Sequence, residues 1–216
     1  MTSIHVGILV YDYQAIDVVG PIDLLQSANS GFLEVSKIFG PINDDAISRA
    51  PDFVFHHVGI TKEPFHLFTS ALTLIPTTSV DECPDLDIIL LGGPNPEGFK
   101  LHPKYIDFIR RHASAGKLLF TVCTGSAVLA STGLLDGKNA TINHAGYKWA
   151  KENYPAVNWT KEKNGSPTKI SGLELVLLRE WIWLHIGSRR NSDWRFLHML
   201  PAIWITSLEA LMVSQL

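Results

Sequence analysis

Residues 117–133 read KLLFTVCTGSAVLASTG, an apolar run that leads into a cluster of small residues. Residues 117–122 are typical of a buried strand, and residues 125–133 are typical of a helix made of small residues. Cys123 lies at the junction, so that the chain passes from strand to helix through one sharp turn. This arrangement resembles a nucleophile elbow, with cysteine in the place of serine.

The same alternation of strand and helix precedes the elbow. Residues 87–91 (DIILL) form a short core strand that runs into the loop 92–96 (GGPNP). Residues 102–115 then carry apolar side chains at helical spacing, and Gly116 ends that predicted helix.

The N-terminal part repeats this pattern. Residues 4–10 (IHVGILV) are predicted to be a strand buried on both faces, and residues 17–27 a helix with Pro21 in its first turn. Residues 65–76 alternate like a pair of short strands at an antiparallel edge. Further short apolar runs occur at residues 32–39 and 53–60. Together these segments predict an α/β fold with a mostly parallel sheet and helices on both faces.

Composition narrows the class of protein. With 216 residues, 46% of them hydrophobic, the chain can build one well-filled domain. A net charge of −3 without a basic stripe argues against a nucleic-acid partner. The sequence has no apolar run of the roughly 20 residues that span a membrane, and its N-terminus lacks the features of a leader. Two cysteines do not make a disulfide framework, and we expect a cytoplasmic protein with free thiols.

Candidate site residues follow three of the predicted strands. Ligands of open parallel sheets bind outside the carboxyl ends of the strands, where Asp17, the Gly92-Gly93 pair and Cys123 are expected. A thiol at the start of a helix should favour its nucleophilic thiolate form. Each residue also has a structural interpretation, because buried free cysteines are commonly inert and an aspartate can simply cap the helix it precedes.

The other polar residues suggest no additional site. Cys83 has no comparable setting and is predicted to be structural, and no cluster has the spacing of metal ligands, so we expect neither metal nor cofactor. Surface positions are expected for Asp23, His56 and His57.

Two segments carry a family resemblance. LLGGPNPEG at residues 90–98 and LLFTVCTGSAVLASTGLLDGKNAT at residues 118–141 resemble the ThiJ/PfpI superfamily, which is related to class I glutamine amidotransferases. The resemblance covers about residues 4–160. It implies a flavodoxin-like fold, a strained elbow cysteine, and backbone N–H groups near Gly93 and Thr124 that can hold negative charge.

A third segment narrows the resemblance to a subgroup. VYDYQAIDVVGPIDLL at residues 10–25 is similar to the subgroup that contains isonitrile hydratases, which carries an aspartate here and a Cys-Thr pair at the elbow. The resemblance implies that Cys123, Asp17 and Thr124 are catalytic. It also implies a homodimeric hydro-lyase that converts a small-molecule isonitrile to an N-substituted formamide through a cysteine thioimidate. PfpI-type peptidases have histidine after the cysteine, so Thr124 counts against peptidase activity. His144 falls where many relatives keep a histidine, and we interpret it as structural or as lining the pocket.

Other functions of the same superfamily stay open at this point. A non-enzymatic redox or stress-response protein would use reversible oxidation of Cys123. The sensor half of a transcription regulator would need a helix-turn-helix module, which this sequence lacks. Glyoxalase-type hydration would call for a glutamate at the position of Asp17 and a committed catalytic histidine.

The resemblance ends near residue 169. Relatives continue with a segment like W-T-S-x-G-V-T-A-G-x-D, whereas residues 171–183 read SGLELVLLREWIW. Reading the codons for residues 170–185 two nucleotides later permits the family's pattern. We therefore predict a domain at residues 4–169 and an atypical segment at 170–216, which we attribute to a frameshift or to a mispredicted exon boundary. Residues 173–186 are apolar enough for a helix. Sequencing of the transcript tests this hypothesis, and an uninterrupted frame would contradict it.

Overall fold

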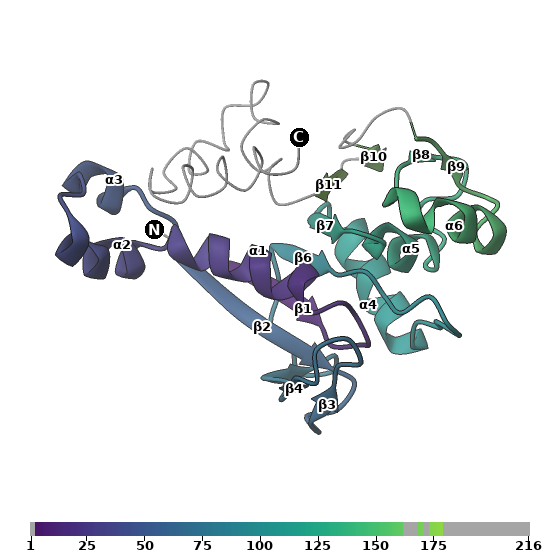
Figure 1. Cartoon of the computed structure of the whole chain (residues 1–216), viewed down its shortest axis with the longest axis horizontal. Helices are drawn as coiled ribbons and strands as arrows, with labels where there is room; N and C mark the ends of the chain where they lie inside the picture. Colours follow the sequence, from purple (N-terminus) through teal and green to yellow (C-terminus); the bar gives the residue numbers. More distant parts are fainter. Residues whose placement is uncertain (1–2, 162–167, 171–172, 179–216) are drawn as a thin grey trace.

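A seven-stranded sheet forms the centre of the computed structural model, which describes residues 3–161, 168–170 and 173–178 (Figure 1). Its strand order is β10-β11-β7-β6-β1-β2-β5. The strands are β1 (Ile4–Leu9), β2 (Phe53–Gly59), β5 (Thr78–Ser79), β6 (Ile88–Leu91), β7 (Leu118–Val122), β10 (Thr168–Ile170) and β11 (Leu173–Leu178). All neighbours pair in parallel except β10, which is antiparallel to β11, so the predicted mostly parallel α/β sheet is confirmed.

The order in which strands are added to the sheet changes direction at β1. From β1 it moves outward to β2 on one side, and later crosses to β6 on the other side and continues to β7. Such a switch point leaves a crevice at the carboxyl ends of the strands where ligands bind in open α/β sheets. The first turn of α1, which carries Asp17, and the loop after β6, which carries Gly93, therefore meet at this point.

Helices connect the strands, and α1, α4 and α5 pack on the main sheet. They are α1 (Ile16–Ser27), α2 (Ser30–Ser36), η1 (Lys37–Phe39), α3 (Asp44–Ser48), α4 (Pro103–Ser114), α5 (Gly125–Ala130), η2 (His144–Gly146) and α6 (Tyr147–Asn153). Figure 1 shows α1 in front of the sheet and roughly along β2; it packs against β2 and β6, whereas α4 packs against β7. The short α5 contacts both β6 and β7, which places the elbow beside the switch point.

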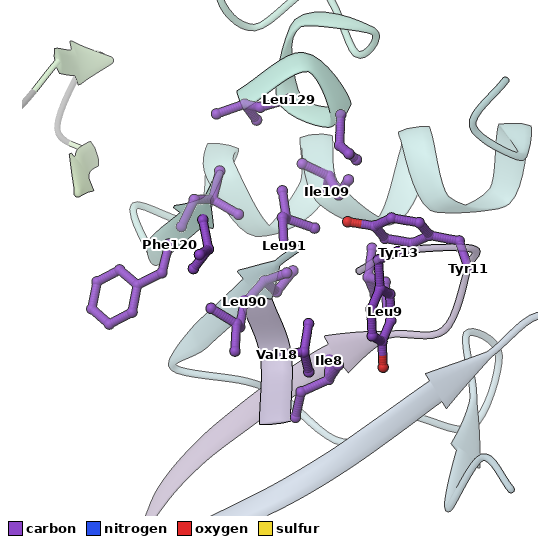
Figure 2. Close-up of a cluster of buried hydrophobic side chains, with 14 of the residues drawn as sticks. Ile8, Leu9, Tyr11, Tyr13, Val18, Leu90, Leu91, Ile109, Phe120 and Leu129 are labelled. Atoms are coloured by element: carbon purple, nitrogen blue, oxygen red, sulfur yellow. The ribbon is translucent and has the colours of Figure 1, made fainter. Parts of the chain in front are cut away.

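The core consists of the strand side chains and the inner faces of these helices (Figure 2). All four residues of β6 are buried, as expected for a central parallel strand covered on both faces. Figure 2 shows Leu91, Ile109 and Leu129 meeting beside the rings of Tyr11 and Tyr13. The apolar carboxyl ends of β1 and β6, the two strands that flank the switch point, are thus packed in the core.

Two small sheets lie outside the main one. β3 (Phe65–His66) and β4 (Thr73–Leu74) pair antiparallel, which confirms the predicted strand pair, although they form a sheet of their own rather than an edge of the main sheet. β8 (Asn139–Ala140) and β9 (Asn158–Trp159) pair in parallel. The apolar run at residues 32–39 is helical, within α2 and η1.

Two predictions about helices need correction. α1 begins at Ile16, so Pro21 lies beyond the first turn, where it offers no N–H to the carbonyl of Asp17. Residues 173–178 form strand β11 instead of a helix, because they pair in parallel with β7 from Leu175–Leu119 to Leu178–Val122. A short apolar run can form either a helix or a strand, and here pairing with the otherwise free edge of β7 makes it a strand. Residues 179–186 lie outside the described residues, and the division at residue 170 and the shifted frame stay predictions.

The histidines of β2 also differ from expectation. His56 and His57 are half-buried within the sheet, whereas Asp23 is exposed as predicted. The imidazoles of His5 and His56 stack, with 2.9 Å between Nδ1 of His5 and Nε2 of His56. In the part of the chain that the structure describes, no helix is long and apolar enough to cross a membrane.

Candidate active site

The turn at Cys123 is strained. Cys123 has a φ of +59°, and Thr124 follows at −91° as the first residue before α5. Among the described non-glycine residues only Cys123 and Ala71 have positive φ. This conformation costs an L-residue roughly 1–2 kcal/mol, and such strain gathers at functional sites. The strained elbow that the family resemblance implied is confirmed.

Glycine is required directly after the elbow. A Cβ on Gly125 would lie 2.2 Å from the carbonyl oxygen of Leu91, which belongs to the neighbouring strand β6. The absence of a side chain therefore lets α5 start against the end of β6. As a result the elbow sits next to the loop that contains Gly92 and Gly93.

Gly93 lies between two of the three residues predicted to be catalytic, Asp17 and Thr124. Leu91 of β6 pairs with Thr121 of β7, so the residues that follow these strands emerge side by side. A Cβ on Gly93 would lie 2.6 Å from Oγ1 of Thr124 and 2.8 Å from Oδ2 of Asp17. The structure thus brings Asp17, Gly93, Cys123 and Thr124 together, although they come from three separate segments.

The loop after β6 is fixed from below by the loop after β1. The Tyr11 hydroxyl donates to the carbonyl oxygen of Gly92 at 2.7 Å, and the N–H of Gln14 donates to the carbonyl oxygen of Gly93 at 2.9 Å. A Cβ on Gly92 would lie 2.8 Å from Cγ2 of Val18. Gly92 therefore serves the close packing of this loop on α1.

Asp17 is a buried carboxyl, with only 6% of its surface exposed. Its Oδ2 accepts the backbone N–H of Gly93 at 2.9 Å. Burial raises the pKa of Asp17, while the Gly93 N–H and a hydrogen bond with Cys123 act in the opposite direction. The position before α1 is held by Ala15, without a side-chain cap, so the capping interpretation of Asp17 is wrong. The Gly93 N–H, predicted to hold negative charge, donates to this carboxyl.

The Cys123 thiol is half-buried and lies beside that carboxyl. Burial raises its pKa, the charge of Asp17 raises it further, and the backbone N–H and hydroxyl of Thr124 act to lower it. We had expected the start of the helix to favour the thiolate. α5 is only six residues long, and desolvation together with Asp17 has the larger effect. Thiol and carboxyl therefore compete for a proton at one place.

Sequence reasoning missed one residue of the site, Asn143. Its Nδ2 donates to Sγ of Cys123 at 3.6 Å, and its backbone N–H donates to the Cys123 carbonyl at 3.2 Å. His144, which we had interpreted as structural or pocket-lining, is exposed and begins η2. The hydrogen bond from this turn to the thiol comes from the residue before it.

The second cysteine offers a contrast. Cys83 is half-buried without such donors, and burial, aided by the charge of Asp85, raises its pKa to about 11. This value fits the structural role predicted for it, because a thiol with so high a pKa is weakly nucleophilic at neutral pH. Within the described ranges no three His, Cys, Asp or Glu side chains are placed to hold a metal ion.

Comparison with known proteins defines the class. The DJ-1/PfpI family matches residues 3–165, so the chain belongs to the DJ-1/PfpI family. The isonitrile hydratase of Pseudomonas putida is 32% identical over 145 residues, which cover 66% of this chain and 54% of that protein. The deglycase PfpI of Pyrococcus furiosus is 29% identical over 86 residues, which cover 36% of this chain and 52% of that one.

Some relatives are regulators. The HTH-type transcriptional regulator GbdR of Pseudomonas aeruginosa is 28% identical over 89 residues, 41% of this chain and 24% of that protein. The chain thus spans about half the length of the hydratase and the deglycase, and about a quarter of the regulator.

Solved structures confirm the fold alone. Drosophila melanogaster DJ-1beta superimposes with a TM-score of 0.58 at 15% identity, covering 82% of this chain and 83% of that one. A ThiJ/PfpI family protein from Pseudomonas syringae gives 0.57 at 19% identity, covering 82% and 64%. The flavodoxin-like arrangement predicted from the sequence is therefore confirmed.

Proposed function

We propose that this protein hydrates an isonitrile, R–N≡C, to the N-substituted formamide, with Cys123 as the nucleophile. The observation that carries the proposal is the buried carboxyl of Asp17 beside the half-buried thiol of Cys123, a pair in which burial raises both pKa values. Two such groups titrate as a pair that shares a proton next to a nucleophilic sulfur. Addition to the terminal carbon of an isonitrile needs this combination, one electron pair and one proton.

The first step forms the carbon–sulfur bond. Sulfur attacks the terminal carbon while the proton of the pair passes from Asp17 to the same carbon, which gives the thioimidate Cys–S–CH=N–R. Asp17 is left as a carboxylate, and the N–H of Gly93, 2.9 Å from Oδ2, stabilises that charge. The reactive carbon thus stays within reach of the group that must next act as a base.

The second step adds water and releases the product. The water oxygen bonds to the thioimidate carbon as Asp17 accepts a water proton and passes it to the substrate nitrogen. The carbon–sulfur bond then breaks, the hydroxyl proton returns to the Asp17–Cys123 pair, and R–NH–CHO leaves. Thr124, whose N–H and hydroxyl act to lower the pKa of the Cys123 thiol, stabilises the departing thiolate. The sum is isonitrile plus water, without a change in oxidation state that needs a redox cofactor.

Further support comes from the similarity to the hydratase of Pseudomonas putida and from the residue after the cysteine, which is Thr124. On the same basis we propose that the protein is a cytoplasmic hydro-lyase that acts as a homodimer on a small-molecule substrate.

The test is turnover of an alkyl and an aryl isonitrile, followed as formamide by mass spectrometry. The wild type and Cys83→Ser should form formamide equally, Cys123→Ala should fall to the uncatalysed rate, and Asp17→Asn should lose roughly 100-fold or more. A folded wild type that forms no formamide would overturn the proposal. Reversible oxidation of Cys123 by peroxide in that protein would then favour the redox or stress-response function.

A further inference from the structure

We infer that Asn143 is a positioning residue that holds the Cys123 sulfur and shifts it toward thiolate. Applied to catalysis, the inference rests on the proposed function, but its effect on the thiol can be measured without turnover. Asn143 lies 20 residues after the elbow, in the turn that leads from β8 into η2, and Nδ2 is 3.6 Å from Sγ. A second bond, from its backbone N–H to the Cys123 carbonyl at 3.2 Å, fixes the turn to the elbow.

The orientation of the Asn143 amide is determined by its other end. Oδ1 accepts the N–H of Ala145 at 3.0 Å, as the cap of η2. A flipped amide would place NH2 against that N–H, with two donors facing each other. The amide NH2 therefore faces the sulfur, and a donor is what a thiolate binds most strongly.

Packing holds the turn in place. Ile142, the residue before Asn143, is buried, with 7% of its surface exposed. Gly146 closes the turn, and a Cβ there would lie 2.7 Å from Cγ2 of Thr124. The turn thus contacts the elbow both at the sulfur and at Thr124, and the exposed amide of Asn143 is held at its two ends by Ala145 and Cys123.

The electrostatic consequence follows from the surroundings of the sulfur. Burial and the charge of Asp17 raise the pKa of Cys123, and the donors of Thr124 oppose them. Thr124 adjoins Cys123 in the chain, whereas Asn143 brings its donor from an independent segment. A hydrogen bond to a charged acceptor is stronger than one to a neutral acceptor, so an amide donor stabilises the thiolate over the thiol. Loss of that donor should raise the pKa of Cys123.

Two variants separate this effect from the cap. Asn143→Asp keeps an oxygen for the Ala145 N–H but replaces the donor to sulfur by a charge. Asn143→Ser keeps a capping oxygen without adding charge and is too short to reach the sulfur. Asn43 is the matched control, because its Oδ1 caps α3 in the same way, accepting the N–H of Asp45 at 2.8 Å. Asn43→Asp and Asn43→Ser therefore change a cap alone.

The measurement is the rate of alkylation of Cys123 by iodoacetamide against pH, in a Cys83→Ser background. Both Asn143 variants should shift the profile to higher pH and react roughly three- to tenfold more slowly at pH 7, since one pKa unit is a tenfold change in thiolate. Both Asn43 variants should match the parent. Circular dichroism and thermal unfolding verify that each variant is folded, and if one Asn143 variant is not, the other decides.

An unchanged alkylation profile in a folded Asn143 variant would overturn the inference, even if formamide turnover fell. A shifted profile supports it whether or not the protein turns over isonitriles. Failure of the hydratase proposal would instead appear as an absence of formamide from the wild type. The two results are therefore independent.

Discussion

Oδ2 of Asp17 and the amide nitrogen of Gly93 lie 2.9 Å apart, although the residues are 76 positions apart in the sequence. This bond joins the first turn of α1, the helix that follows β1, to the loop after β6 at the switch point of the sheet. The carboxyl is nevertheless buried, and its raised pKa shows that desolvation outweighs the single N–H that it accepts.

Asp17→Asn should therefore stabilise the protein at neutral pH while it removes activity. A folded-state pKa above the ordinary value of 3.8 means that the folded chain holds the proton more tightly than the unfolded chain. The free energy of unfolding of the wild type, relative to Asp17→Asn, falls as pH rises from 3.8 through the raised folded value and stays low above it. Urea denaturation of both proteins at pH 4 and pH 7 measures this gap. An increase in the free energy of unfolding of the wild type relative to Asp17→Asn from pH 4 to pH 7 would contradict this prediction.

Gly93→Ala should disrupt the site with a limited effect on the fold. The new methyl would lie 2.6 Å from Oγ1 of Thr124 and 2.8 Å from Oδ2 of Asp17, so one of these groups must move. A displacement of this size costs about 100-fold in rate, and overpacking costs about 1–3 kcal/mol. Steady-state kinetics and urea denaturation check the two effects.

Gly40→Ala is the control for that substitution. Its backbone is extended, with φ of 164°, and a Cβ there meets nothing within 4 Å. Equal activities of Gly93→Ala and Gly40→Ala would show that the space at Gly93 is unimportant.

The backbone strain at the elbow should be measurable as stability. The free energy of unfolding of Cys123→Gly should exceed that of Cys123→Ala by about 1 kcal/mol, because glycine adopts a φ of +59° without steric cost. Urea denaturation of the two variants measures this difference. Ala71 is exposed and has a φ of +53°, so Ala71→Gly should likewise raise the free energy of unfolding. If both glycine variants are less stable than their alanine counterparts, the strain is not where the dihedral angles place it.

Acid should destabilise the protein through the histidines of β2. Burial lowers the pKa of His56 and of His57, and His5 lowers that of His56 further. A histidine whose folded pKa is below the ordinary value of 6.5 binds its proton more tightly when unfolded, so the free energy of unfolding falls as pH drops through 6.5. Thermal unfolding from pH 8 to pH 5 should show this fall, and His56→Gln should reduce it. An identical slope in the variant would remove His56 from the explanation.

The sequence was informative where local pattern and long-range structure agree. Residues 87–91 and 117–122 are continuous apolar runs, which only a sheet covered on both faces can bury, and both proved to be parallel core strands. The LELVLL run of β11 suits a helix or a strand equally, and its pairing with β7 depends on which edge is free. Pattern alone could not decide that case.

The site shows the same division. Cys123 at a strand end could be predicted, because a strand followed at once by small residues is a local signal. The raised pKa of its thiol could not, since it arises from burial and from Asp17, which lies 106 positions earlier in the chain. Asn143 gave no signal at all, because an asparagine in a turn is most often a cap, and only the folded turn brings its other end to the sulfur.

Leu91 and Val122, the last residues of β6 and β7, are at most 7% exposed, while the polar groups of the site begin one or two residues later. The residues that stabilise the sheet and the residues that form the site therefore occupy different positions of the chain. Exchanges at the strand ends can therefore redirect the reactivity of the cysteine without altering the packing of the sheet beneath. A lineage built in this way can diverge into members described as a hydratase, a deglycase and a regulator without having to reinvent its fold.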